Sequence, residues 1–143
     1  MLRVSRLADY ASVVMTCLAC QPREVLSAVQ ISEATRLELP TVSKLLKQLA
    51  HANLVESFRG AAGGYRLARS PGEITLAEIV EALDGPIGMT DCCVAGCDRE
   101  VHCDVSHGWR SVGGVVDAAL RAVSLADMLR SAQSRTPRPR AGA

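Results

Sequence analysis

The chain has 143 residues, of which 48% are hydrophobic, and its 16 basic residues nearly balance its 15 acidic ones. This hydrophobic content excludes a mostly disordered protein, and the length suits one compact domain with a modest appendage. Because the net charge is only +1, any basic surface for a nucleic acid must be local. The apolar runs are shorter than the roughly 20 residues of a membrane helix, and the N-terminus lacks a signal-peptide pattern. We therefore expect a cytoplasmic protein without membrane contacts.

Apolar residues recur at helical spacing in the first part of the chain. The spacing predicts a helix over 6–20 and a short helix over 28–35, which opens with a capping box between Ser27 and Gln30. Pro40 suits the first turn of another helix, predicted over 40–52. These residues therefore predict three consecutive helices, the last two joined by a short turn.

A hairpin follows these helices. Residues 54–58 and 65–68 are predicted as its strands, and the glycine-rich segment 59–64 as its tip. Two helices and a two-stranded hairpin in this order are typical of a winged helix-turn-helix, whose second helix enters the major groove of DNA. The predicted fold class is mainly α, with a winged helix-turn-helix domain and a two-stranded β-wing.

The second half of the chain alternates between helical patterns and an irregular segment. A capping box between Thr75 and Glu78 predicts a helix, and a similar box between Ser124 and Asp127 predicts a short terminal helix after a long amphipathic one. The segment between them that carries most of the cysteines has no sustained apolar periodicity, so we expect a loop that something other than a packed core orders. The predicted division is a winged helix-turn-helix domain over 1–84, a cysteine loop over 85–106, a dimerisation helix with the terminal helix over 107–130, and a disordered basic tail over 131–143.

The second helix of the predicted helix-turn-helix carries four polar residues away from its apolar stripe: Thr41, Ser43, Lys44 and Lys47. Hydroxyl groups can bond base edges or phosphates, and lysines neutralise phosphate charge. In the hairpin tip, Arg59 is a candidate for a minor groove. Three glycines there would let the backbone approach DNA closely: Gly60, Gly63 and Gly64. Taken singly, the lysines fit a solvated helix face equally well, but the order of elements favours double-stranded DNA as the partner.

The six cysteines should be reduced thiols in a chain without an export signal, which favours metal or redox chemistry over disulfides. Cys17 and Cys20 lie in the first helix and are interpreted as small buried hydrophobic side chains. The other four share a stretch of a dozen residues: Cys92, Cys93, Cys97 and Cys103. Thiolates are the usual ligands of iron–sulfur clusters, and a loop can wrap several of them around one centre.

The segment from Arg59 to Arg69, with Leu54 and Val55 before it and the cysteine group and Trp109 after it, resembles the Rrf2 family of bacterial winged-helix repressors. That family includes IscR, NsrR and the regulators of SUF iron–sulfur assembly operons, and the resemblance covers roughly residues 1–130. It implies a homodimer, formed through the long C-terminal helix, that reads a palindromic promoter site. The apolar stripe available for this seam comprises Trp109, Val112, Val116, Ala119, Leu120 and Val123.

The resemblance also implies three cysteine ligands to a cluster of the 2Fe–2S or 4Fe–4S type, with five residues in each gap. Five residues separate Cys97 from Cys103, but only four separate Cys92 from Cys97. The second gap matches and the first is short. The predicted ligands are therefore Cys97, Cys103 and Cys92, with Cys93 as a possible substitute.

The resemblance leaves two sources for a fourth ligand. In IscR-like proteins it is a histidine three residues after the last cysteine, but Ser106 holds that position here and His107 follows it. In NsrR-like proteins it is an N-terminal acidic residue of the other subunit, and Asp9 stands at the matching place. We rank Asp9 ahead of His107, although a carboxylate that complements a helix dipole explains Asp9 equally well. A metal ligand shared between loop and DNA-reading domain would give a two-state switch.

Zinc is the main alternative to an iron–sulfur cluster. Tetrahedral cysteine and histidine ligation fits the same loop, with Cys92 or Cys93, Cys97, Cys103, and His102 or His107 as ligands. A zinc protein would be a DNA-binding regulator without redox sensing. An enzyme is not expected, because no catalytic nucleophile with a base can be placed. The preferred hypothesis is a repressor that senses iron–sulfur or redox status and controls iron–sulfur assembly genes.

Overall fold

The computed structural model describes residues 3–94 and 96–134. Its elements follow the order α1 (Arg6–Ala19), α2 (Ala28–Thr35), α3 (Leu39–His51), β1 (Val55–Phe58), β2 (Gly64–Leu67), η1 (Pro71–Glu73), α4 (Leu76–Asp84), α5 (Asp91–Val94), η2 (Glu100–His102), α6 (Ser106–Arg121) and α7 (Leu125–Gln133). The predicted mainly helical, winged helix-turn-helix fold is confirmed. No helix in the described part of the chain is long and apolar enough to cross a membrane.

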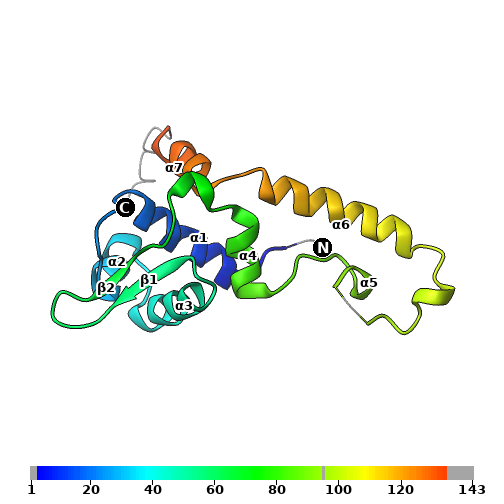
Figure 1. Ribbon diagram of the computed structural model, residues 1–143, viewed down its shortest axis with the longest axis horizontal. Helices are drawn as coiled ribbons and strands as arrows, with labels where there is room; N and C mark the ends of the chain where they lie inside the picture. Colours follow the sequence, from blue (N-terminus) through cyan, green and yellow to red (C-terminus); the bar gives the residue numbers. More distant parts are fainter. Residues whose placement is uncertain (1–2, 95, 135–143) are drawn as a thin grey trace, which may run out of the picture.

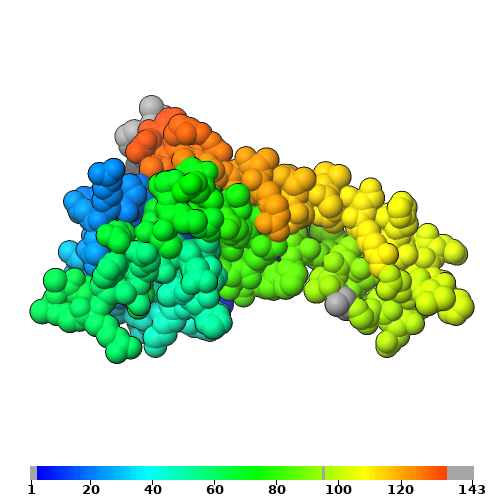
Figure 2. Space-filling view, viewed as in Figure 1, coloured from blue at the N-terminus to red at the C-terminus, as the bar shows by residue number. Residues whose placement is uncertain are grey.

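Two regions are distinct in Figure 1, a rounded body and a narrow arm. The body consists of α1 to α4, the β1–β2 hairpin and α7. The arm is α6, which extends away from the body and carries α5 and η2 beside its far end. The space-filling view in Figure 2 shows the same arm projecting from the body.

One apolar core holds the body together. The apolar stripe of α3 is fully buried in it, at Val42, Leu45, Leu46 and Leu49. Each such side chain stabilises the fold by about 1.5–3 kcal/mol when it leaves water. Because the stripe faces inward, the opposite face of α3 must point to the surface.

Side-chain caps determine where several helices begin. The three predicted capping boxes are formed, at Ser27–Gln30, Thr75–Glu78 and Ser124–Asp127. In each box the first hydroxyl accepts a hydrogen bond from the backbone N–H three residues later, and the later side chain accepts one from the first residue's N–H. The cap of α1 is not among the predicted ones: the Ser5 hydroxyl accepts a hydrogen bond from Ala8 N–H at 3.1 Å.

The wing is tied to the segment before α2 as well as folded on itself. Strands β1 and β2 pair antiparallel, and Leu26 adds a short bridge to Tyr65, with N···O distances of 2.9 and 2.7 Å. A Cβ on Gly64 would lie 2.3 Å from the Leu26 carbonyl oxygen, and a Cβ on Gly63 would lie 2.6 Å from that of Phe58. Contacts inside the chain therefore already require glycine at both positions. Close approach of the backbone to DNA, the predicted reason for these two glycines, is not needed to explain them.

The arm and the C-terminal segment differ from the predicted boundaries in three places. The predicted loop contains the short helices α5 and η2. The long helix ends at Arg121, so Val123 lies in the connection to α7, where its carbonyl accepts from Leu76 N–H at 2.9 Å. Because α7 runs to Gln133, the first residues assigned to the tail are helical, and residues 135–143 of that tail lie outside the described residues.

Candidate functional site

The polar face of α3 carries the four residues predicted to contact DNA. Lys44 and Lys47 are exposed, and Thr41 and Ser43 are half-buried on the same helix. Helix α2 leads into α3 through Arg36, which adopts the left-handed conformation with φ of 59°. The body therefore presents two cations and two hydroxyls beside one another on its recognition helix.

Arg59 is exposed at the tip of the wing. A second arginine, Arg66 on β2, makes side-chain contacts across the two strands. The Arg66 guanidinium lies 5.0 Å from the centroid of the Phe58 ring and donates to a Glu56 carboxylate oxygen at 2.8 Å. Cation–π and ion-pair contacts at exposed sites each contribute about 1 kcal/mol or less. This stack was not predicted from the sequence, although opposite charges that face each other across a hairpin are a recognisable signal.

All four cysteines of the loop are reduced and half-buried. The Thr90 hydroxyl oxygen lies 2.9 Å from Cys92 Sγ and 3.4 Å from Cys93 Sγ. The hydrogen bond with Thr90 holds the pKa of the Cys93 thiol below its usual range. A lowered pKa favours the thiolate, which is the form that binds metal ions.

The candidate ligands are not gathered at one point. Within residues 3–94 and 96–134, no three cysteine, histidine, aspartate or glutamate side chains come close enough to hold a metal ion. Cys92 and Cys93 lie on α5, Cys97 follows in the loop and Cys103 follows η2. His102 and His107 are exposed. The donor chemistry of the thiols fits an iron–sulfur cluster or zinc, whereas a complete ligand set is not formed by these side chains as they stand.

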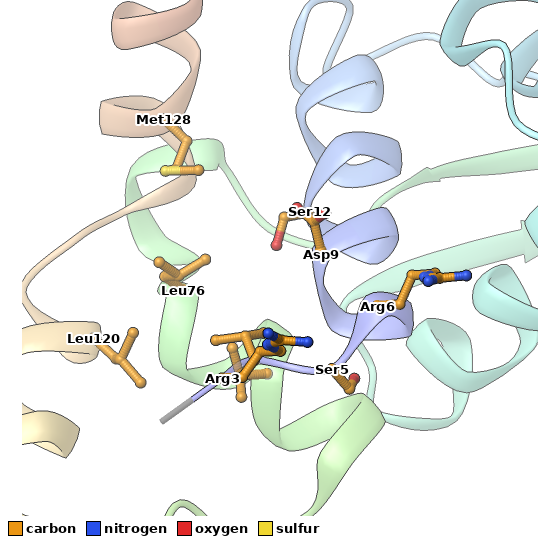
Figure 3. Close-up of a pocket in the computed structure, with 10 residues that line it drawn as sticks. Arg3, Ser5, Arg6, Asp9, Ser12, Leu76, Leu120 and Met128 are labelled. Carbon is orange, nitrogen blue, oxygen red and sulfur yellow. The ribbon is translucent and has the colours of Figure 1, made fainter. Parts of the chain in front are cut away.

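Asp9 lies far from these cysteines in the same chain. It is exposed on α1 and lines a pocket of about 660 Å³ between α1, α4, α7 and the C-terminal end of α6 (Figure 3). Leu120 of α6 also lines that pocket, whereas Cys93 contacts the carbonyl of Trp109 eleven residues earlier. Eleven residues of α-helix span about 16 Å. Asp9 and the cysteine loop of one chain therefore lie at opposite ends of α6.

The two cysteines of the first helical segment are remote from the loop in sequence and differ from each other. Cys17 is half-buried, and burial raises the pKa of its thiol, with Cys20 adding to the rise. Cys20 caps the C-terminus of α1 and is exposed, so the predicted burial of this residue is wrong. It lies at the helix end, where the periodicity of the apolar face no longer applies.

The predicted dimerisation stripe of α6 divides into two parts. Trp109 and Val112 are 43% and 45% exposed, and their neighbour Val115 is 68% exposed. Val116 and Leu120 are half-buried and line a pocket together with Val80 of α4. The outer part of α6 therefore presents apolar side chains to the surface, while its inner part packs toward the body.

Comparison with known proteins finds clear relatives. A family model described as "Rrf2: Iron-dependent Transcriptional regulator" matches residues 4–131. The HTH-type transcriptional regulator IscR of Aliivibrio salmonicida is 30% identical over 122 residues, covering 84% of this chain and 73% of the relative. Among solved structures, CymR, the global cysteine regulator of B. subtilis, matches with a TM-score of 0.75 and 28% identity over 92% of this chain and 98% of CymR. T. potens IscR matches with a TM-score of 0.71 and 30% identity over 96% of this chain and 94% of that chain.

Proposed function

Since this chain belongs to the Rrf2 family of iron-dependent transcriptional regulators, we propose that it is a dimeric repressor whose cysteine loop senses iron–sulfur or redox status. It is a transcription regulator and not an enzyme. The observation that carries the proposal is the group of four reduced, half-buried cysteines in the loop between α4 and α6. Relatives named IscR and the resemblance to SUF regulators support iron–sulfur assembly genes as the targets.

The proposed DNA interface combines α3 with the wing. Helix α3 would enter the major groove, with Lys44 and Lys47 on phosphates and Thr41 and Ser43 on base edges or phosphates. Arg59 would enter the adjacent minor groove, and Gly60, which has open space around its Cβ position, would let the backbone approach. Two copies related by a two-fold axis would read a palindromic promoter site.

The proposed dimer forms through the exposed apolar strip of α6. Trp109, Val112 and Val115 are each more than 40% exposed, with Ala119 exposed on a later turn of the same helix. Contiguous apolar side chains on a surface mark an interaction site when they are not scattered singly. A second copy of α6 supplies a matching apolar face, because a two-fold interface places the same patch on both subunits.

The proposed metal ligands are Cys92, Cys97 and Cys103, with a fourth from the partner's Asp9. The opposite placement of Asp9 and the loop along α6 supports a ligand from a second subunit, since one chain does not bring them together. When bound, an iron–sulfur cluster supplies a redox centre whose integrity depends on oxidants and on iron supply. The loop connects α4 to α6, so its order would set how the arm is held against the DNA-reading body.

Anaerobic purification with iron and sulfide analysis tests the proposal. We expect the wild type to contain iron and acid-labile sulfide and to show charge-transfer absorption in the visible range. Cys97→Ala should lose the iron, the sulfide and this absorption. Cys20→Ala is the matched control, because Cys20 is an exposed cysteine outside the loop, and it should keep the wild-type spectrum. A colourless protein with stoichiometric zinc would replace this proposal by a zinc-stabilised regulator without redox sensing.

A further inference from the structure

One arginine of α6 contacts both halves of the cysteine loop. Arg110 Nε donates to the Cys92 carbonyl oxygen at 3.2 Å, and the same guanidinium forms an ion pair with the Glu100 carboxylate. Cys92 belongs to α5 and Glu100 to η2. The planar guanidinium has five N–H donors in a fixed arrangement, so it can hold two acceptors at once. Arg110 thus joins the two ends of the segment that contains Cys97.

The loop docks on α6 at a second point, one helical turn further along. Cys93 Sγ lies 3.4 Å from the Trp109 carbonyl oxygen, and it lies 3.4 Å from the position that a Cβ on Gly113 would take. Gly113 is the one buried residue of α6. Helix α5 therefore packs at van der Waals distance from this position of α6.

These contacts matter because an apolar core does not order this segment. In the described part of residues 85–124 no apolar side chain is fully buried. The half-buried Ile87 and Met89 line a pocket with residues of α6, so the polar contacts to α6 add to a limited apolar packing. A tight turn supports the path of the loop, since Gly96 has φ of 79° in a conformation that favours glycine. An exposed ion pair alone contributes little, but the same guanidinium also holds the Cys92 carbonyl, so Arg110 connects α5 with η2.

We propose that Arg110 is a positioning residue of the metal centre, which closes the cysteine loop on α6 by bridging the Cys92 carbonyl and the Glu100 carboxylate. The inference rests on the proposed function for the identity of the centre, and the closure itself is a property of this chain. The two polar contacts of Arg110 are made to a backbone carbonyl and to Glu100, and neither is to a candidate ligand side chain. It brings the backbone of Cys92 toward η2 and toward Cys103, which follows η2 directly.

The experiment compares Arg110→Gln, Arg110→Lys and Arg121→Gln with the wild type. Arg121 is the matched control because it also lies on α6 and forms ion pairs, with Asp117 and Glu81, away from the loop. In anaerobically purified holoprotein, we expect a chelator to bleach the visible absorption about tenfold faster in Arg110→Gln than in the wild type. A tenfold change in rate is the order of magnitude expected when one hydrogen bond to a charged group is lost. Arg110→Lys keeps the positive charge, so its bleaching rate should lie between those of Arg110→Gln and the wild type. Arg121→Gln should bleach at the wild-type rate.

A second measurement on the metal-free protein separates this inference from the proposed function. Limited proteolysis should cut within residues 94–104 faster in Arg110→Gln than in either the wild type or Arg121→Gln, with equal thermal unfolding midpoints. If the wild type lacks iron and sulfide but the loop of Arg110→Gln is cut faster, the proposed function fails and the loop closure stands. Equal bleaching and equal cleavage in Arg110→Gln and the wild type would overturn the role of Arg110.

Discussion

The body and the arm of this molecule are stabilised in different ways. Among the residues that the structure describes, the nineteen buried apolar side chains all lie in the body, from Ala8 to Val80 and at Leu125. In the arm, Arg110 forms an ion pair with Glu100 of η2, and Arg121 joins α6 to Glu81 of α4. Val116 and Leu120 of α6 are only half-buried toward the body, and the outer apolar side chains of α6 remain at the surface. A region that buries no apolar side chain gains little hydrophobic stabilisation. The body is therefore stabilised by its own core, whereas the arm, under the proposed function, would gain further order from a second copy and a metal centre.

The largest effect should come from the core of the body. Leu46 is fully buried, and Leu46→Ala should lower the free energy of unfolding by about 2–5 kcal/mol because it removes buried methyl groups and leaves a cavity. Urea unfolding followed by circular dichroism measures the loss. Val101→Ala on the arm is the control, since this side chain is 87% exposed, lies outside the proposed dimer strip, and should change the value by less than about 0.5 kcal/mol. Equal losses in the two variants would show that apolar side chains contribute to the free energy of unfolding to the same extent in the body and in the arm.

A charge on the outer face of the arm should act on assembly instead of on folding. In Val112→Glu, like charges would meet across the two-fold axis in an apolar seam, so we expect a predominantly monomeric protein with unchanged helical content. Analytical ultracentrifugation reads the mass. Ala118→Glu places the same charge at another exposed position of α6 and should stay dimeric; a dimeric Val112→Glu would argue against this face.

A substitution on the surface of the wing should weaken DNA binding and leave the metal content unchanged. Arg59→Ala should weaken binding to a palindromic promoter by about 1–3 kcal/mol and lower the salt dependence by about one counterion, while iron content stays unchanged. Fluorescence anisotropy at several salt concentrations measures both quantities. Arg130→Ala, at an exposed position of α7, should bind as the wild type does. Unaltered affinity in Arg59→Ala would exclude the minor-groove contact.

The smallest effect concerns acid stability of the body. Burial alone would raise the pKa of Glu78, but hydrogen bonds from the Thr75 N–H and from Arg69 outweigh it and lower the pKa below the usual 4.5. A carboxylate with a lowered folded-state pKa stabilises the fold above its unfolded-state pKa, and this contribution disappears as the pH falls through the folded-state pKa. The urea midpoint of Glu78→Gln should therefore fall less between pH 7 and pH 3 than that of the wild type. Glu24→Gln, at an exposed position, is the control and should follow the wild-type profile.

Local patterns in the sequence determined most of the body. The three capping boxes predicted their helices because a cap involves residues only three positions apart, and the stripe of α3 predicted its buried face because helical periodicity is local. The order of helices and hairpin, together with the wing motif, indicates a winged helix-turn-helix without reference to any tertiary contact. The cysteine spacing likewise identified the loop that carries the candidate metal ligands.

Contacts between distant segments decided the remainder. The bridge between Leu26 and Tyr65 brings the Leu26 carbonyl so close to position 64 that only glycine fits there. No local sequence motif predicts this pairing, because the two residues are far apart in the chain. Arg110 joins Cys92 to Glu100, and Asp9 lies at the end of α6 opposite the cysteines, because packing of α6 against α4 and α5 sets these positions. Sequence spacing specifies which residues share a helix face or a loop, whereas the distance between two elements depends on how their side chains pack in three dimensions.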